Sequence, residues 1–309
     1  MEKVTSASIL VVGGTGFIGH HVVRRAIDSG WRATSIGLNP PSPTRMVTGA
    51  DYVALDMTNP GALSRLGVLN FDYVVNLGGY VDHMPIEAGG GRVIRAHFDA
   101  LVTLIESLDR KRLRRFVQIG SSDEYGNAAA PQCENLRESP ISPYSAAKVA
   151  ATPLIQLPHQ SEDFPGIVLR PFLTYGPGQD QRRFLPQLIQ GCLDRRVFPV
   201  SEGAQLRDFC YVHDTVDAIF RSLECDNACG QIFNIASGEP RSIRSVIDSV
   251  VSLVGSGTPK FGAIAYRRGE SMALYADVTL ARTVLGWEAK TPFLEGVAET
   301  IAWMKSCPP

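Results

Sequence analysis

The most constraining feature of the sequence is a glycine triplet that follows an apolar run near its start. In "ILVVGGTGFIG", Gly13, Gly16 and Gly19 stand three residues apart, directly after residues 9–12. The first glycine permits a tight turn, the second lets backbone approach a diphosphate, and the third allows close helix–strand packing. A helix beginning near Phe17 and Ile18 would point its positive N-terminus at the phosphates. The triplet therefore predicts a dinucleotide site.

The first half of the chain alternates β-branched runs with segments of helical length. The expected strands are "SILVVGG", "RATSIG", "DYVALD", "DYVVNLGG", "RRFVQIGSS" and "GIVLRPFLTYG". This order predicts an α/β fold, a Rossmann-like doubly wound parallel sheet with helices on both faces. After about Pro171 the pattern becomes mixed. We expect a dinucleotide-binding domain over residues 1–175, with a return segment near 212–238, and a smaller C-terminal mixed α/β lobe that binds substrate over 176–309.

Composition favours a small-molecule enzyme in the cytoplasm. A formal net charge of −1 creates no field that would attract nucleic acid or a membrane surface. The apolar run at 9–12 is far shorter than a signal segment or a membrane span. Six cysteines show neither a disulfide framework nor paired zinc spacing, so we expect reduced thiols and no metal.

A second group of residues indicates chemistry. In "YSAAK", Tyr144 and Lys148 stand four residues apart and would share one face of a helix. A nearby cation favours phenolate, so we expect a lowered pKa for Tyr144 and acid/base function near neutral pH. The strand ending at Gly120 would deliver Ser121 to the carboxyl end of the sheet, where ligands bind in open α/β folds.

These motifs occur in an order that resembles the extended short-chain dehydrogenase/reductase family of nucleotide-sugar enzymes. The matching segments are "GGTGFIG", "SSDEYG", "PYSAAK", "LRPFLTYGPGQ", "RDFCYVHDTVDAI", "FNIASGEP" and "LGWEAKTPFLEGVAETIAWM". The resemblance implies that Ser121, Tyr144 and Lys148 are catalytic, and that Tyr144 and Lys148 also bind the cofactor. It implies that Asp56 contacts adenine, that Arg207 and Arg267 bind the substrate's diphosphate, and that the protein is a homodimer.

Three features of the sequence depart from the family pattern. Members that prefer NAD usually end the second strand with an acidic residue, and here that place falls on Gly37. No carboxylate there repels a 2′-phosphate, and Asn39 and Arg45 are candidate donors to one, so we predict NADP, with NAD as the alternative. The "LAA" after the fourth strand is "LGG" here. His97 stands where asparagine is usual and receives no role.

The reaction is predicted from the segment after the catalytic serine and from the second half. Ser122 and Asp123 are expected at the substrate, and with Glu124 they partly resemble the acids of 4,6-dehydratases. Segments such as "RRFLPQLIQGCL" and "KFGAIAYRRGESM" are similar to 4-ketoreductases of dideoxysugar biosynthesis. We therefore predict a reductase of 4-keto-6-deoxy nucleotide sugars. The alternatives are a 4-epimerase, a 4,6-dehydratase, and a redox sensor that binds dinucleotide without turnover.

Overall fold

The largest element is a seven-stranded sheet in which every neighbouring pair is parallel, in the order β10-β6-β5-β4-β1-β2-β3. The computed structural model describes residues 6–59, 61–82, 84–266 and 269–307. The strands of this sheet are β1 (Ser8–Val12), β2 (Arg32–Gly37), β3 (Asp51–Ala54), β4 (Tyr73–Asn76), β5 (Arg115–Ile119), β6 (Gly166–Pro171) and β10 (Ile232–Ile235). All six expected strands form, and the predicted Rossmann-like fold is confirmed.

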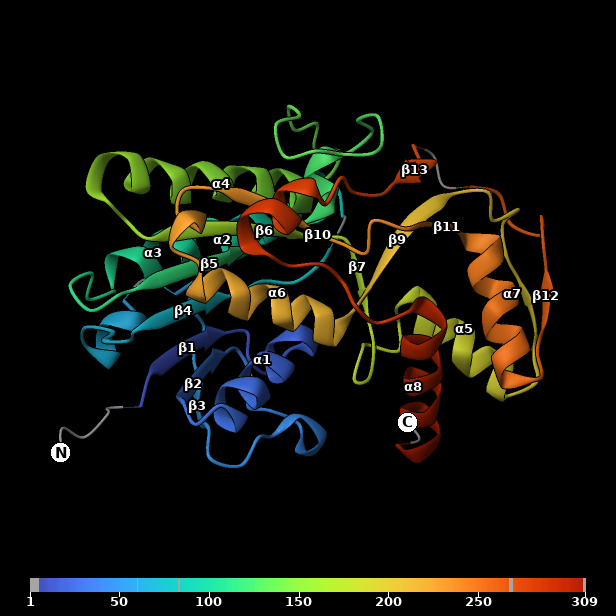
Figure 1. Cartoon of the computed structure of the whole chain (residues 1–309), viewed down its shortest axis with the longest axis horizontal. Coiled ribbons are helices and arrows are strands. Elements are labelled where there is room, and N and C mark those ends of the chain that lie inside the picture. The colour runs from blue at the N-terminus through green and yellow to red at the C-terminus, as the bar shows by residue number, and fades with distance from the viewer. Residues whose placement is uncertain (1–5, 60, 83, 267–268, 308–309) are drawn as a thin grey trace.

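Helices cover both faces of the sheet (Figure 1). They are α1 (Phe17–Asp28), α2 (Gly91–His97), α3 (Asp99–Glu106), α4 (Pro143–Glu162) and α6 (Val212–Glu224). Ile9 and Val11 of β1 belong to the apolar cluster formed with α1 and α6, whereas Leu10 and Val12 belong to the cluster formed with α3 and α4. Because both faces of the strand are buried, β1 appears in the sequence as an unbroken apolar run.

A late segment of the chain returns to this sheet. After α6, β10 adds to the sheet edge by pairing in parallel with β6, at the far end from β3. The return lies within the predicted 212–238 segment. The division of the chain into a dinucleotide-binding domain and a substrate lobe at residue 175 remains a prediction.

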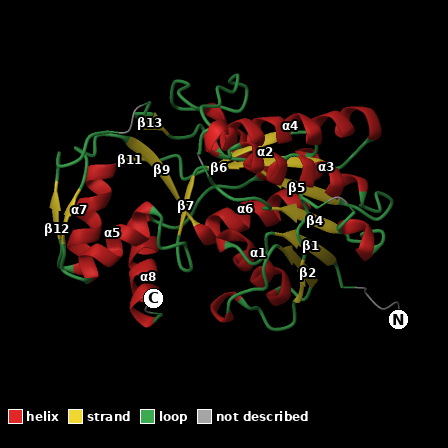
Figure 2. Ribbon diagram, turned by 180° about the vertical axis from the view of Figure 1, so that it is seen from behind, coloured by secondary structure: helices red, strands yellow, loops and turns green. Residues whose placement is uncertain are grey.

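A smaller mixed sheet and the helices packed beside it lie at the other end of the molecule (Figures 1 and 2). Strand β9 (Leu206–Tyr211) is central, pairing in parallel with β7 and β13 and antiparallel with β11. The other elements are β7 (Leu173–Tyr175), α5 (Phe184–Leu193), β8 (Val197–Pro199), β11 (Pro240–Ser242), α7 (Ile243–Val254), β12 (Thr258–Lys260), β13 (Ala273–Leu274) and α8 (Phe293–Ser306). This arrangement confirms the predicted smaller mixed α/β part.

The strand order predicts where a ligand would bind. Strands β1 and β4 are neighbours, and the connections that leave them run to opposite sides of the sheet. In open α/β sheets, ligands bind outside the carboxyl ends of the strands at such a switch point. Gly13 directly follows β1, and Ser121 lies two residues beyond the end of β5, so both stand at the carboxyl ends of the strands.

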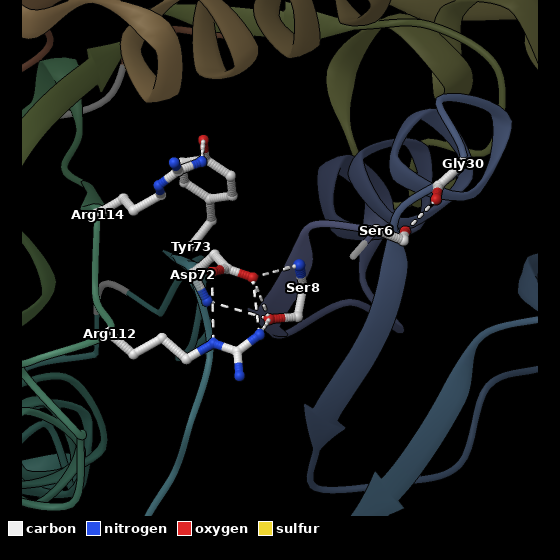
Figure 3. A network of polar contacts seen from close by, with 7 residues as sticks. All are labelled: Ser6, Ser8, Gly30, Asp72, Tyr73, Arg112 and Arg114. Carbon is white, nitrogen blue, oxygen red and sulfur yellow. Dashed lines mark hydrogen bonds and ion pairs between the residues drawn. The ribbon is translucent and has the colours of Figure 1, made fainter. Parts of the chain in front are cut away.

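At the opposite ends of the strands, where β1 and β4 begin, the carboxylate of Asp72 joins the two strands (Figure 3). Its Oδ2 accepts hydrogen bonds from the Ser8 backbone N–H at 2.8 Å and from the Ser8 hydroxyl at 2.6 Å. The Arg112 guanidinium also donates to it, with its nearer nitrogen 3.2 Å from Oδ2. Burial raises the pKa of Asp72, but the hydrogen bonds from Ser8 and then Arg112 outweigh it and lower the pKa to about 2. The network joins the starts of β1 and β4.

Replacing this carboxylate should destabilise the fold in a pH-dependent way. Because Asp72 ionises well below its ordinary pKa of 3.8, it stabilises the fold above about pH 4, and this contribution is lost as the pH falls towards 2. Chemical denaturation of wild type and Asp72→Asn should therefore give different unfolding free energies at pH 6 that converge at low pH. Asp51→Asn, at the exposed start of β3, is the control and should show no such convergence. A stability difference independent of pH would contradict this account.

Candidate active site

The glycine loop is shaped by backbone contacts that exclude side chains. Gly13 has a φ of +79°, and a Cβ on it would lie 3.0 Å from the carbonyl oxygen of Leu77. A Cβ on Gly19 would lie 2.1 Å from the Gly13 carbonyl oxygen. Helix α1 starts at Phe17, directly after Gly16, whose cap carries no side-chain hydrogen bond. The first N–H groups of a helix lack intrahelical acceptors, so this bare end, which includes Ile18, fits an anionic diphosphate.

Arg45 turns towards this loop. Its guanidinium donates to the backbone carbonyl of Thr15 at 3.2 Å and to that of Gly178 at 2.8 Å. Gly37 ends β2 on the same side, since a Cβ on it would lie 3.0 Å from the Thr15 hydroxyl oxygen. The Arg45 cation thus lies beside the glycine loop, near the end of β2, where the resemblance places an acidic residue in NAD-preferring members.

Two further predicted cofactor residues, Asn39 and Asp56, follow the ends of β2 and β3 and differ in their environments. Asn39 follows β2 by two residues and is exposed. Asp56 follows β3 by two residues, and its Oδ1 accepts hydrogen bonds from the Thr58 backbone N–H at 2.9 Å and hydroxyl at 2.7 Å. These bonds fix the Asp56 carboxylate at the carboxyl end of the sheet. Its contact with adenine remains a proposal.

Ser121 is held by a reciprocal cap at the end of β5. A short 3₁₀ turn, Ser122–Tyr125, follows it, and the Ser121 hydroxyl oxygen accepts a hydrogen bond from the Asp123 N–H at 3.1 Å. In return, the Glu124 carboxylate accepts from the Ser121 N–H at 2.8 Å. This capping box fixes the position of a serine that is itself largely buried.

Glu124 belongs to the scaffold of the site. Its other oxygen accepts from the Arg170 guanidinium at 2.8 Å and from the Thr152 hydroxyl at 3.2 Å. The side chains of Glu124 and Arg170 are both fully buried, and Arg170 also contacts Glu138 at 2.5 Å. The sequence did not reveal this pair, because Arg170 lies 46 residues from Glu124 in an apolar strand.

Tyr144 and Lys148 are positioned by the first turns of α4. The helix begins at Pro143, and Ser142 caps it through a capping box with Ser145. Lys148 donates through Nζ to the carbonyl oxygen of Ile119 at 2.7 Å, and Nζ lies 5.9 Å from the centre of the Tyr144 ring.

The Tyr144 phenol also forms a side-chain hydrogen bond with Ser121. The structure therefore brings Ser121, Tyr144 and Lys148 together, as expected. Their catalytic roles remain a proposal.

The expected lowering of the Tyr144 pKa is wrong for this structure. Burial raises the pKa of the phenol well above its ordinary value, and the nearby Asp123 carboxylate raises it further, while the hydrogen bond with Ser121 opposes them. Burial also lowers the pKa of Lys148 to about 8, although Glu124 opposes this shift. The sequence showed the pairing of phenol and ammonium but not their desolvation, which outweighs it.

Three of the predicted substrate residues, Ser122, Asp123 and Arg207, lie in the described part of the chain. The Asp123 carboxylate is within electrostatic range of both Tyr144 and Arg207. Arg207 pairs with Glu270, at an N–O distance of 2.5 Å. Ser122 is buried within the 3₁₀ turn. Arg267 lies outside the described residues.

Sequence reasoning gave no role to His97, yet it lies in the site. Its ring packs edge-on against Tyr144, with the ring centroids 5.4 Å apart. Its Nε2 is 3.0 Å from the carbonyl oxygen of Tyr80, and the imidazole is buried. The signal available in the sequence was the departure from asparagine at this position.

The described ranges contain neither a membrane-spanning helix nor a metal-binding cluster. No described helix has the length and apolar character needed to cross a membrane. The same residues contain no cluster of three or more His, Cys, Asp or Glu side chains that could hold a metal ion.

The fold and this site together define a short-chain dehydrogenase/reductase. A parallel sheet of the Rossmann order carries a glycine loop with an uncapped helix start, and Ser121, Tyr144 and Lys148 gather at the same edge. The chain belongs to the NAD dependent epimerase/dehydratase family, whose pattern matches residues 9–236. It is an enzyme of that family, and the resemblance inferred from the sequence is confirmed.

Individual relatives cover nearly the whole chain or much of it. The chain is 26% identical to a dTDP-glucose 4,6-dehydratase of Xanthomonas campestris pv. campestris (strain B100), over 96% of this chain and 93% of the relative. It is 30% identical to the uncharacterized UDP-glucose epimerase YtcB of Bacillus subtilis (strain 168), over 68% and 66%. Among solved structures, MoeE5 in complex with UDP-glucuronic acid and NAD is similar, with a TM-score of 0.85 and 29% identity over 97% of this chain and 99% of MoeE5.

Removing the charge of the Glu124 carboxylate should destabilise the region that positions Ser121 and α4. Breaking a buried ion pair by changing one partner leaves an uncompensated charge, so Glu124→Gln should reduce the free energy of unfolding by about 3–5 kcal/mol. Glu138→Gln, at the more exposed partner of the same Arg170, is the matched control and should cost clearly less. Urea titrations of both variants would measure the difference. Equal losses in the two variants would show that the Glu124 pair does not hold this region.

Proposed function

We propose that the protein reduces the C4 keto group of a 4-keto-6-deoxy nucleotide sugar, with NADP(H) as its cofactor. The observation that carries the proposal is the burial of Glu124 against Arg170. The turn after β5 thereby presents one acid, Asp123, beside Tyr144, whereas elimination across C5 and C6 needs both a base and an acid. This arrangement favours hydride transfer without dehydration.

The cofactor residues support a dinucleotide with an anionic ribose substituent. The glycine loop and the start of α1 would hold the diphosphate, Asp56 the adenine and Lys148 the nicotinamide ribose. Arg45 lies beside the loop, and Gly37 replaces the acidic residue that would repel a phosphate. Arg45 would therefore pair with a 2′-phosphate. When bound, a reduced nicotinamide supplies the hydride that the keto carbon accepts.

The proton comes from the protein in this mechanism. Tyr144 carries its proton at neutral pH because burial raises the pKa of the phenol. It donates this proton to the oxygen of the sugar carbonyl as the carbon is reduced, and Ser121 hydrogen-bonds the same oxygen. The Lys148 ammonium, 5.9 Å from the Tyr144 ring, stabilises the phenolate that remains. Arg207 binds the diphosphate of the nucleotide sugar.

A 4-epimerase is the second candidate. It is favoured by the similarity to YtcB and to MoeE5, whose complex contains a UDP-sugar and NAD. An epimerase returns the hydride to the same sugar, so Tyr144 would have to remove a proton before giving it back. A homodimer and a cytoplasmic location remain predictions made from the sequence.

One incubation series separates these activities. Purified protein would be supplied with a 4-keto-6-deoxy nucleotide sugar and NADPH, and separately with UDP-glucose, UDP-glucuronic acid or dTDP-glucose without added cofactor. Loss of reduced-nicotinamide absorbance with formation of a 4-hydroxy product supports the reductase. A C4 epimer in the second series would replace the proposal with the epimerase, and a 4-keto-6-deoxy product would replace it with the dehydratase.

Tyr144→Phe tests the proton donor. The variant lacks the transferable proton but keeps the ring that packs against His97, so cofactor affinity should stay nearly unchanged while turnover falls about 10²–10⁴-fold. Fluorescence titration and steady-state kinetics would measure the two quantities. Tyr73→Phe, at the opposite edge of the sheet, is the control and should keep full turnover. An active Tyr144→Phe enzyme would remove the mechanism.

Arg45 and Gly37 test the cofactor assignment. Loss of a charge-assisted contact to a phosphate costs about 1.5–3 kcal/mol, so Arg45→Ala should weaken NADPH binding about 10- to 100-fold and leave NADH binding nearly unchanged. Arg32→Ala, at the exposed start of β2, is the control. Gly37→Asp should shift preference towards NADH. Wild-type protein that binds NADH at least as tightly as NADPH would overturn the assignment.

A further inference from the structure

The imidazole of His97 has a defined tautomer. Its Nε2 lies 3.0 Å from the carbonyl oxygen of Tyr80, and a carbonyl only accepts, so Nε2 carries the proton and donates. Burial and, secondly, the Lys148 ammonium together lower the pKa of His97 to about 3, although the hydrogen bond to Tyr80 opposes them. The ring is therefore neutral, and Nδ1 is an unprotonated acceptor.

This acceptor has no hydrogen-bond partner within the described part of the chain. Nδ1 is buried and receives no hydrogen bond from the described residues. The residue as a whole is only 5% exposed. A buried acceptor without a donor costs free energy, and such groups are rare in folded proteins. The ring that carries Nδ1 packs against Tyr144, where the substrate oxygen and the nicotinamide are proposed to meet, and a molecule bound there is a candidate source of the donor.

The chain makes room for this imidazole by leaving residue 79 without a side chain. A Cβ on Gly79 would lie 2.1 Å from Cε1 and 2.4 Å from Nδ1 of His97. Two departures from the family pattern, glycine in the second alanine position of "LAA" and histidine in place of asparagine, thus form one packing unit. The ring occupies the space that the side chain of another residue at 79 would fill.

We propose that His97 is a ligand-binding residue of the active site, whose Nδ1 accepts a hydrogen bond from a sugar hydroxyl bound beside Tyr144. Two sources offer this group, the nicotinamide ribose of the cofactor and the sugar of the substrate. The substrate source rests on the proposed function, and the cofactor source needs only a nicotinamide dinucleotide. The bond would orient the sugar ring relative to the Tyr144 phenol.

The test compares His97→Phe with His97→Asn. Phenylalanine keeps a planar ring in the space beside Gly79 but has no acceptor, whereas asparagine keeps an oxygen at the same distance along the side chain as Nδ1. Affinities would be measured for NADPH by fluorescence, and for UDP and a UDP-sugar by calorimetry. Circular dichroism and thermal unfolding would establish that both variants fold. Nitrogen-15 NMR of labelled wild-type protein would follow the Nδ1 resonance during each titration.

We expect His97→Phe to lose about 3- to 10-fold in affinity for one ligand, as for a single hydrogen bond, and His97→Asn to recover most of it. Loss for NADPH identifies the cofactor ribose, and loss for the UDP-sugar with unchanged UDP identifies the substrate. The Nδ1 resonance should shift with that ligand alone. Equal affinities of both variants and wild type for all ligands, or an equal loss for UDP and the UDP-sugar, would overturn the proposal.

If wild-type protein binds NADPH but no nucleotide sugar, the proposed function fails, while the NADPH comparison still decides the role of His97. The two conclusions are therefore tested separately by the same set of titrations.

Discussion

The candidate active site depends on the buried ion pair between Glu124 and Arg170. One carboxylate oxygen of Glu124 holds the backbone of Ser121, and the other contacts Arg170 of β6 and Thr152 of α4. It therefore ties the end of β5 to the helix that carries Tyr144 and Lys148. A buried pair contributes less to net stability than its Coulomb energy suggests, because both charges lose their hydration. Its value here lies in fixing the relative positions of the groups that would transfer a proton.

The same ion pair gives two adjacent acids different roles, because Glu124 is buried in it and Asp123 is not part of it. Glu124 is buried in the protein interior, and Asp123 acts electrostatically on Tyr144 and Arg207. A site with one acid, a buried phenol and a buried ammonium can transfer a single proton to or from a sugar oxygen. Under the proposed function, this division would separate the activity of the chain from that of the 4,6-dehydratase with which it shares 26% identity over most of its length.

The sequence predicted the features that depend on local pattern. The glycine triplet, the apolar runs and the four-residue spacing of Tyr144 and Lys148 follow from backbone geometry, and they led to the fold and to the residues that meet at its edge. Features set by distant packing were missed. Whether Asp123 or Glu124 is buried depends on Arg170, the pKa of Tyr144 depends on desolvation, and the place of His97 depends on Gly79, and no local pattern encodes any of these.

In the proposed function, a reduced nicotinamide bound at this site would supply one hydride to C4 of a nucleotide sugar while Tyr144 supplies the proton. The most direct measurement is mass spectrometry and NMR of the product formed from a 4-keto-6-deoxy nucleotide sugar and reduced cofactor deuterated at the transferable position. The account predicts one deuterium, bound to C4 of the sugar, for each cofactor oxidised. A product without deuterium at C4, or no oxidation of the cofactor, would contradict it.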